Sequence, residues 1–332
     1  MKKDTEITLS RRRFLEYATT LSAVALGSSY SMFNNNSSHS PMNHIAGTEV
    51  PPSPAILTPK TITLETNAPE TIIRQSDEQV PEVVDVTEAI EKAERQRMLE
   101  KVQRFDEDLE GDLWLSEQEW LLLQSAHSKI ERVKNYVGYG HFNILSFDEM
   151  LKYAKSVTSI GAFDKQELVL LEANFYRDAA DLGFMGQKVV DNLTNQVKKT
   201  NVSKIPGSGH YLFKGESEEY LKALQKKIGD DLILTSGVRS VVKQYQLYFQ
   251  KVIDRKGNLS RASRSLAPPG YSFHASGDFD VGQRDYGKLN FTAQFEKSEV
   301  YKRLADEGVI RIRYTADNLL GVRYEPWHIR MV

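Results

Sequence analysis

The stretch from Leu266 to Val281, LAPPGYSFHASGDFDV, constrains the fold more than any other part of the chain. The Pro-Pro-Gly run fixes φ and then releases it, so the backbone is expected to turn sharply before His274. Polar and apolar residues then alternate from Asp278 onward, which is typical of a half-buried strand with Asp278 and Asp280 on one face. A turn that holds a histidine and a strand end that holds an aspartate can therefore meet at one metal ion.

A second stretch near the C-terminus, Tyr-Glu-Pro-Trp-His at residues 324–328, supplies the groups that the first lacks. Taken alone, His274 would more often be a packed or solvated histidine than a ligand, and Glu325 a solvated strand residue. Together the two stretches contain two imidazoles, a carboxylate ligand and a spare carboxylate for proton transfer. A mononuclear zinc hydrolase requires this set of groups.

Three motifs in order carry a specific resemblance. They are Ser-Gly-Val-Arg-Ser at 236–240, then Ser272, His274 and Gly277, and finally Glu-Pro-Trp-His at 325–328. This pattern resembles the zinc D-alanyl-D-alanine carboxypeptidases of the VanY and VanX type. Their superfamily (LAS) also includes other peptidoglycan peptidases and the hedgehog signalling domain. The resemblance covers the C-terminal part of the chain, and nothing upstream contributes to it.

One departure from that family concerns the aspartate. The family's aspartate follows its histidine by seven positions, whereas Asp280 follows His274 by six and Asp278 by four. Asp280 is favoured because Asp-Val at 280–281 is similar to the family's Asp-Ile ending, which implies a one-residue deletion after Gly277. Asp278 stays open as the alternative ligand.

The resemblance implies a role for each of these groups. The implied zinc ligands are His274, Asp280 and His328, with water in the fourth position. Glu325 would take a proton from that water and pass it to the leaving amine. Arg239 would bind the substrate carbonyl or carboxylate, and Ser272 and Gln244 would contact the substrate.

Helices mixed with short strands, without regular βαβ alternation, indicate an α+β fold. The expected organisation is a twin-arginine signal region at 1–30, a linker at 31–85, an all-helical region at 86–203 and a peptidase domain at 204–332. The peptidase domain should hold a short, mostly antiparallel sheet with flanking helices. Strands are expected at 232–235, 278–281, 309–314 and 322–332, and helices at 217–227, 241–253 and 298–307. The helical region, with capping boxes at Ser116 and Ser146, is assigned no chemistry.

The N-terminus predicts export. Ser-Arg-Arg-Arg-Phe-Leu at 10–15 fits the twin-arginine signal, and the apolar run after it is too short to cross a bilayer. A disordered basic N-terminus is the alternative. We expect passage through the twin-arginine (Tat) machinery to the periplasm or cell envelope, with no stable membrane span after processing. The absence of cysteine agrees with export and excludes a cysteine nucleophile.

The formal net charge of −2 provides no electrostatic case for nucleic acid or an anionic membrane surface as a partner.

Residues 106–117 match the spacing of a calcium-binding EF-hand loop, although Glu110 stands where Asp or Asn is usual. The alternative is an acidic surface turn.

The sequence as a whole predicts a zinc-dependent D-alanyl-D-alanine carboxypeptidase that acts on peptidoglycan stem peptides. The substrate class comes from the resemblance alone. Two alternatives remain, namely an endopeptidase that cuts peptide crosslinks and a zinc-containing binding module that has lost catalysis. The intact Glu325 argues against the second of these.

Overall fold

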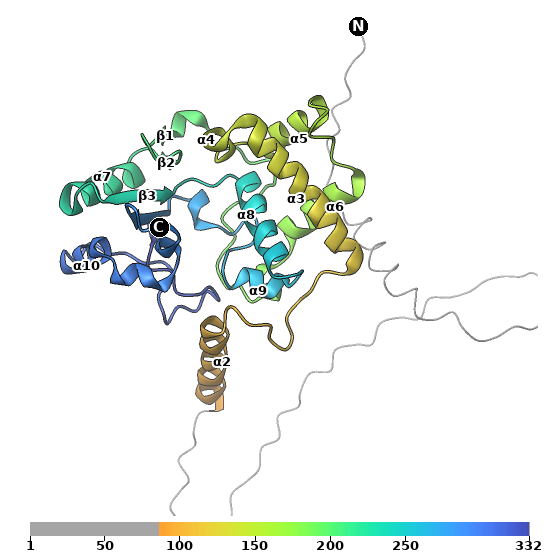
Figure 1. Ribbon diagram of the computed structural model, residues 1–332. Coiled ribbons are helices and arrows are strands. Elements are labelled where there is room, and N and C mark those ends of the chain that lie inside the picture. The colour runs from red at the N-terminus through yellow and green to blue at the C-terminus, as the bar shows by residue number, and fades with distance from the viewer. Residues whose placement is uncertain (1–85, 332) are drawn as a thin grey trace, which may run out of the picture. The chain divides into compact units, whose positions relative to one another are not determined.

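A computed structural model describes residues 86–331 of the chain (Figure 1). The twin-arginine stretch and the linker lie outside the described residues. Within residues 86–331, no helix combines the length and the apolar character needed to span a membrane.

The first part of the described chain is helical, as its capping patterns predict. Its helices are α2 (Val86–Gln103), α3 (Glu117–Val137), α4 (Tyr139–Phe142), α5 (Phe147–Ser156) and α6 (Lys165–Tyr176). Reciprocal capping boxes begin α3 at Ser116, α5 at Ser146 and α6 at Asp164. Each satisfies backbone N–H groups that the first helical turn leaves unpaired.

The second part combines helices with short strands, which confirms the α+β class. Its helices are α7 (Glu216–Ile228), α8 (Val241–Asp254), α9 (Leu259–Ser263) and α10 (Glu299–Asp306). Its strands are β1 (Val202–Lys204), β2 (Tyr211–Phe213), β3 (Leu232–Ser236), β4 (Phe279–Gln283) and β5 (His328–Ile329). Short 3₁₀ turns are η1 (Ala179–Leu182), η2 (Lys199–Asn201), η3 (Phe273–Ala275), η4 (Gly287–Phe291) and η5 (Ala293–Lys297).

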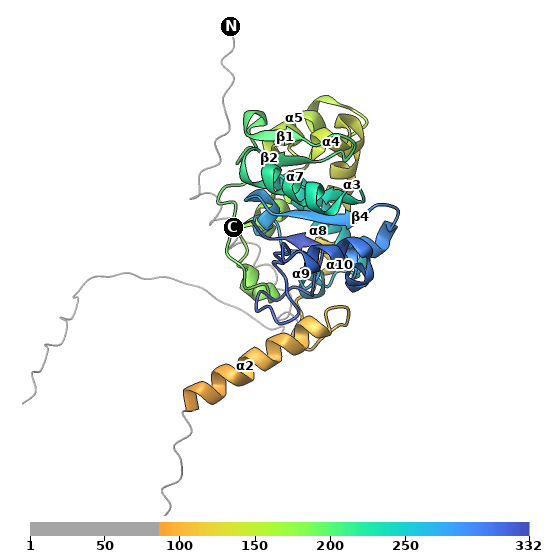
Figure 2. The same ribbon diagram turned by 90° about the vertical axis from the view of Figure 1, so that its left-hand side faces the viewer.

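The strands form two small antiparallel sheets. β1 pairs with β2, and a three-stranded sheet has the order β3-β4-β5. Helices α7 and α10 pack against this second sheet (Figure 2). Their apolar side chains bury a core with the sheet, and Trp327 lies in that core. The sheet is the scaffold on which the site described below is placed.

Two expected strands are much shorter than the alternating patterns at 309–314 and 322–332 suggest. Only a single bridge between Ile312 and Ile329 marks the first, and only the two residues of β5 mark the second. Pro326 lacks an N–H to donate to a ladder, and the His328 N–H donates to the Glu325 carbonyl in a turn. The chain therefore turns immediately before β5 rather than running straight into it.

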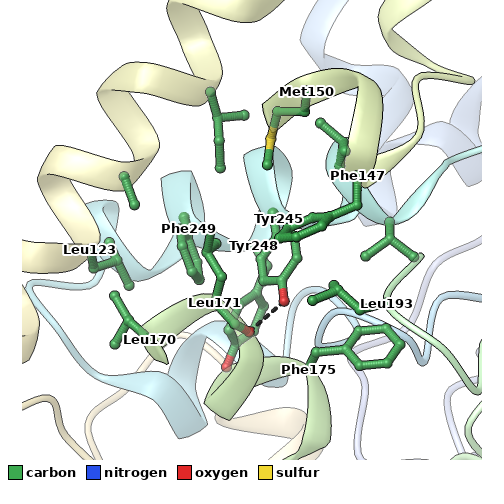
Figure 3. Packing of buried hydrophobic residues seen from close by; sticks show 14 of the residues in the cluster. Leu123, Phe147, Met150, Leu170, Leu171, Phe175, Leu193, Tyr245, Tyr248 and Phe249 are labelled. Carbon is green, nitrogen blue, oxygen red and sulfur yellow. Dashed lines mark hydrogen bonds between the residues drawn. The ribbon is translucent and has the colours of Figure 1, made fainter. Parts of the chain in front are cut away.

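The largest hydrophobic cluster joins the helical region to α8 (Figure 3). Tyr245, Tyr248 and Phe249 of α8 are fully buried and contact apolar side chains from α3, α5 and α6. The Tyr245 hydroxyl donates a hydrogen bond to the Leu171 carbonyl of α6. Since α8 follows β3 directly, this core links the helical region to the three-stranded sheet.

Candidate active site

The turn between β3 and α8 forms one wall of the site. Its Gly237 packs so closely against β2 that an added Cβ would lie 2.0 Å from the Tyr211 carbonyl oxygen. The next residue, Val238, donates its N–H to that same carbonyl. Ser240 then caps α8. Arg239 therefore sits between a strand end and a helix start, where the sequence places it.

His274 is held by this turn. It lies on η3 and is completely buried, and its Nδ1–H donates to the Gly237 carbonyl at 2.8 Å. This bond leaves Nε2 as the nitrogen with a free lone pair. Nε2 lies 3.4 Å from Oδ1 of Asp280.

Sheet register brings Asp280 and His328 together. Asp280 of β4 is paired with His328 of β5, and Ser236 of β3 lies on its other side. The His328 Nδ1 is 3.3 Å from the Asp280 Oδ1, and the rings of His274 and His328 meet edge to face with centroids 4.8 Å apart. The ligand atoms of these three buried residues all lie within 4.8 Å of one another.

The donor set and its hydrogen bonding fit a metal ion. Within residues 86–331, His274 Nε2 and Asp280 Oδ1 are buried side-chain atoms that have no hydrogen-bond partner. Buried polar atoms are rarely left in that state, so a ligand is expected to satisfy them. Two imidazoles and one carboxylate are the ligands of a catalytic zinc with one open position.

Asp278 lies on the opposite edge of the His328 ring from Asp280. Its Oδ2 accepts a hydrogen bond from His328 Nε2 at 3.0 Å, and it is not part of the three-residue group. Asp278 directly precedes β4, which begins at Phe279, whereas Asp280 lies within that strand.

Glu325 stands beside the group. Its Oε2 lies 3.6 Å from His328 Nδ1, and its other oxygen lies 3.6 Å from the Arg323 guanidinium. The Glu325 N–H donates to the Tyr314 carbonyl, which fixes the backbone of this turn. The carboxylate is thus held next to the three potential ligands without being one of them.

Arg239 is engaged with the same group. Its Nη2 donates to Asp280 Oδ2 at 2.6 Å and its Nε to the Ser236 hydroxyl. Arg239, Gln244 and Ser272 lie together with Leu247, Leu266 and Ala267 around a narrow pocket that has no room for a water molecule. The Gln244 side chain also bonds the Arg239 carbonyl and the Gly270 N–H, so it clasps α8 to the Pro-Pro-Gly turn.

Charges in the site follow from burial and close partners. Burial opposes ionisation of Asp280, but the neighbouring His274, Arg239 and His328 hold its pKa well below the usual range. Burial also opposes a charge on His328, yet its bonds to Asp278 and Glu325 raise its pKa to about 9. In His274, burial and the Arg239 charge lower the pKa.

Sequence reasoning missed Arg313. Arg313 forms a bidentate pair with Asp278, and only the alternation in Arg-Ile-Arg-Tyr at 311–314 could have drawn attention to it. His210 is buried and 3.2 Å from the Tyr139 hydroxyl, and burial followed by the Arg239 charge lowers its pKa to about 4. His210 is outside the three-residue group.

The EF-hand-like loop contacts arginines. Asp112 pairs with Arg264 at 2.7 Å and Asp108 with Arg261 at 3.1 Å, and Asp106 pairs with Arg255. These contacts favour the acidic-turn alternative. Residues 257–265 behind these arginines are mostly buried, and Leu259–Ser263 within them form α9.

Comparisons with known proteins agree with the predicted resemblance. Residues 214–332 match the VanY family model, described as D-alanyl-D-alanine carboxypeptidase. The carboxypeptidase-like protein YodJ of Bacillus subtilis (strain 168) is 30% identical over 132 residues, which span 35% of this chain and 45% of YodJ. The chain therefore covers less than half of that relative's length.

Solved structures give partial matches. VanYB in complex with D-alanine-D-alanine is 23% identical, with a TM-score of 0.34, over 46% of this chain and 86% of that one. The LD-carboxypeptidase LdcB is 28% identical, with a TM-score of 0.32, over 37% of this chain and 59% of that one. The family resemblance predicted from the motifs is confirmed for the C-terminal part of the chain.

Proposed function

Because residues 214–332 match the VanY family model, we propose that this protein is a zinc-dependent D-alanyl-D-alanine carboxypeptidase. Its substrate would be the terminal D-alanine of peptidoglycan stem peptides. The observation that carries the proposal is the buried group of His274, Asp280 and His328, in which two ligand atoms have no hydrogen-bond partner, with Glu325 beside it.

His274, Asp280 and His328 would hold the metal through Nε2, Oδ1 and Nδ1. Zinc, when bound, supplies a Lewis acid that polarises the scissile carbonyl and lowers the pKa of water. Glu325 would accept the proton of the attacking water and deliver it to the leaving amine. Its Oε2 lies 3.6 Å from His328 Nδ1, so the carboxylate would stand beside the bound metal rather than among its ligands.

The side chains around the small pocket would orient the substrate. Arg239 would bind the substrate carbonyl or carboxylate, where a planar guanidinium stabilises developing negative charge. Its bond to Asp280 also fixes the carboxylate that serves as ligand. Ser272 would contact the substrate, as the family resemblance implies. Gln244 would act there chiefly by holding the pocket wall, since its side-chain amide donates a hydrogen bond to the Arg239 carbonyl and accepts one from the Gly270 N–H.

The location that suits this substrate is the periplasm or cell envelope, reached by the twin-arginine route. The arginines of the signal lie outside the described residues. Replacing Arg11 and Arg12 by lysine is expected to leave the protein in the cytoplasm, as measured by cell fractionation. Unchanged export would contradict this part of the proposal.

Mass spectrometry of defined muropeptides tests the activity. A linear pentapeptide and a crosslinked dimer would be incubated with the wild type and with Glu325→Gln, after zinc content has been measured in both. Loss of one alanine from the pentapeptide with the wild type alone, at equal zinc content, is the expected result. Cleavage only of the crosslink would identify an endopeptidase. No cleavage by a zinc-loaded wild type would favour a binding module.

A further inference from the structure

Both nitrogens of the His328 ring face carboxylates. Nε2 lies 3.0 Å from Asp278, whereas Nδ1 lies 3.3 Å from Asp280 and 3.6 Å from Glu325. A carboxylate accepts hydrogen bonds and does not donate them when ionised. The shorter contact therefore assigns the proton of neutral His328 to Nε2 and leaves the Nδ1 lone pair facing Asp280.

Asp278 is itself held in place by three hydrogen bonds from two residues. Arg313 donates from Nε at 2.6 Å and from Nη2 at 2.9 Å, and the Met331 N–H donates at 2.8 Å. The Arg313 guanidinium stacks on the ring of Phe273, the residue before His274, with its central carbon 3.9 Å from the ring centroid. The Asp278 side chain is fully buried. A carboxylate anchored in this way can impose a fixed orientation on its histidine.

The other contacts of the His328 ring restrict it further. Tyr314 meets the ring edge to face, with centroids 4.9 Å apart and an interplanar angle of 74°. His274 meets the ring at a similar distance. Rotation of the imidazole by a half turn would direct Nε2 away from Asp278 and leave that buried carboxylate without one of its partners.

We propose that Asp278 is a positioning residue, which sets the tautomer and orientation of His328 so that Nδ1 is presented to the metal. This inference rests on the zinc site proposed above. It gives each of the two neighbouring aspartates a separate task, with Asp280 as ligand and Asp278 as the support of a ligand. Removal of such a support typically costs 10–100-fold in metal affinity.

The test is a double-mutant cycle on zinc affinity, measured by competition with a chromophoric chelator on the full chain. The variants are Asp278→Asn, His328→Ala and the combination of the two. Asp278→Asn is expected to weaken zinc binding about 10–100-fold. The same change should have no further effect once His328 is absent, because its influence passes through that ring. Asp306→Asn, an exposed aspartate on α10, is the matched control and should bind zinc like the wild type.

Three results would overturn the inference, and they are distinguishable. Equal zinc affinity of Asp278→Asn and wild type would remove the positioning role while leaving the zinc site intact. If Asp278→Asn weakened zinc binding just as much when His328 is already replaced by alanine, its effect would be a general structural one and would not pass through the His328 ring. Failure of the wild type to bind zinc would overturn the metal site together with the role of Asp278. If Asp278→Asn does not fold, Arg313→Gln repeats the cycle by releasing the carboxylate, with a smaller expected loss.

Discussion

The buried amine of Lys243 should impose a measurable pH dependence on stability. Lys243 lies on α8, and its Nζ donates to Gln246 at 2.8 Å and stands 5.3 Å from the centre of the Tyr139 ring. Burial, followed by the charges of Arg239 and Lys134, lowers its pKa to about 7.

The sign follows from proton counting. An unfolded lysine titrates near 10.5, so between about pH 7 and pH 10.5 the unfolded chain holds a proton that the folded chain has released. The free energy of unfolding contributed by Lys243 therefore rises with pH through that window, by at most about 1.4 kcal/mol per pH unit. Below pH 7 both states are protonated, and the contribution stays at its least favourable value.

Lys243→Met keeps an unbranched side chain and removes the titration. Urea unfolding followed by tryptophan fluorescence at pH 7, 8 and 9 would compare it with the wild type. The variant should be the more stable protein at pH 7, and its advantage should shrink by up to about 3 kcal/mol by pH 9. Lys226→Met, at an exposed position on α7, controls for the change in net charge. Stability curves of wild type and Lys243→Met that run parallel in pH would refute the reasoning.

Three further results are expected. Gly237→Ala would place a methyl group against the Tyr211 carbonyl oxygen and so displace the Gly237 carbonyl, which accepts the hydrogen bond from His274. We expect the free energy of unfolding to fall by about 1–3 kcal/mol and zinc binding to weaken. Both quantities can be measured on one preparation of the variant. Asp112→Asn would leave the buried Arg264 with a neutral partner, and the loss should approach the 3–5 kcal/mol typical of a broken buried pair in urea unfolding. Chelation of zinc should lower the melting temperature of the protein, because a ligand that binds the folded state stabilises it. Zinc binding should also release a proton near pH 8, because the pKa of metal-free His328 is raised to about 9. Calorimetry in buffers of different ionisation enthalpy would measure that proton.

The site was largely predictable because its residues occupy short, well-separated motifs whose local geometry is strongly determined. A Pro-Pro-Gly turn, a strand-to-helix turn with a tightly packed glycine and a Glu-Pro-Trp-His turn each fix one or two side chains. The three-residue group of His274, Asp280 and His328 lies together as expected. The roles of these residues stay proposals.

The two aspartates could not be separated by sequence because the answer depends on where β4 begins. Strict alternation places Asp278 and Asp280 on one face, but the ladder with β5 starts only at Phe279. Asp278, just before this ladder, contacts Nε2 of the His328 ring, and Asp280, within the ladder, contacts Nδ1. Boundaries of short strands are set by pairing partners distant in sequence, which periodicity does not reveal.

The packing of the helical region against the peptidase part was also not predictable from the sequence. An amphipathic pattern shows that a helix face is buried but does not say against what. The apolar side chains of α8 pack into the helical cluster, while Gln244 of the same helix clasps the pocket wall beside Arg239. The position of α8 thus depends on packing with α3, α5 and α6. Residues that contact no substrate therefore help to determine where Arg239 and its partner Asp280 lie, and the helical region is part of the support of the site.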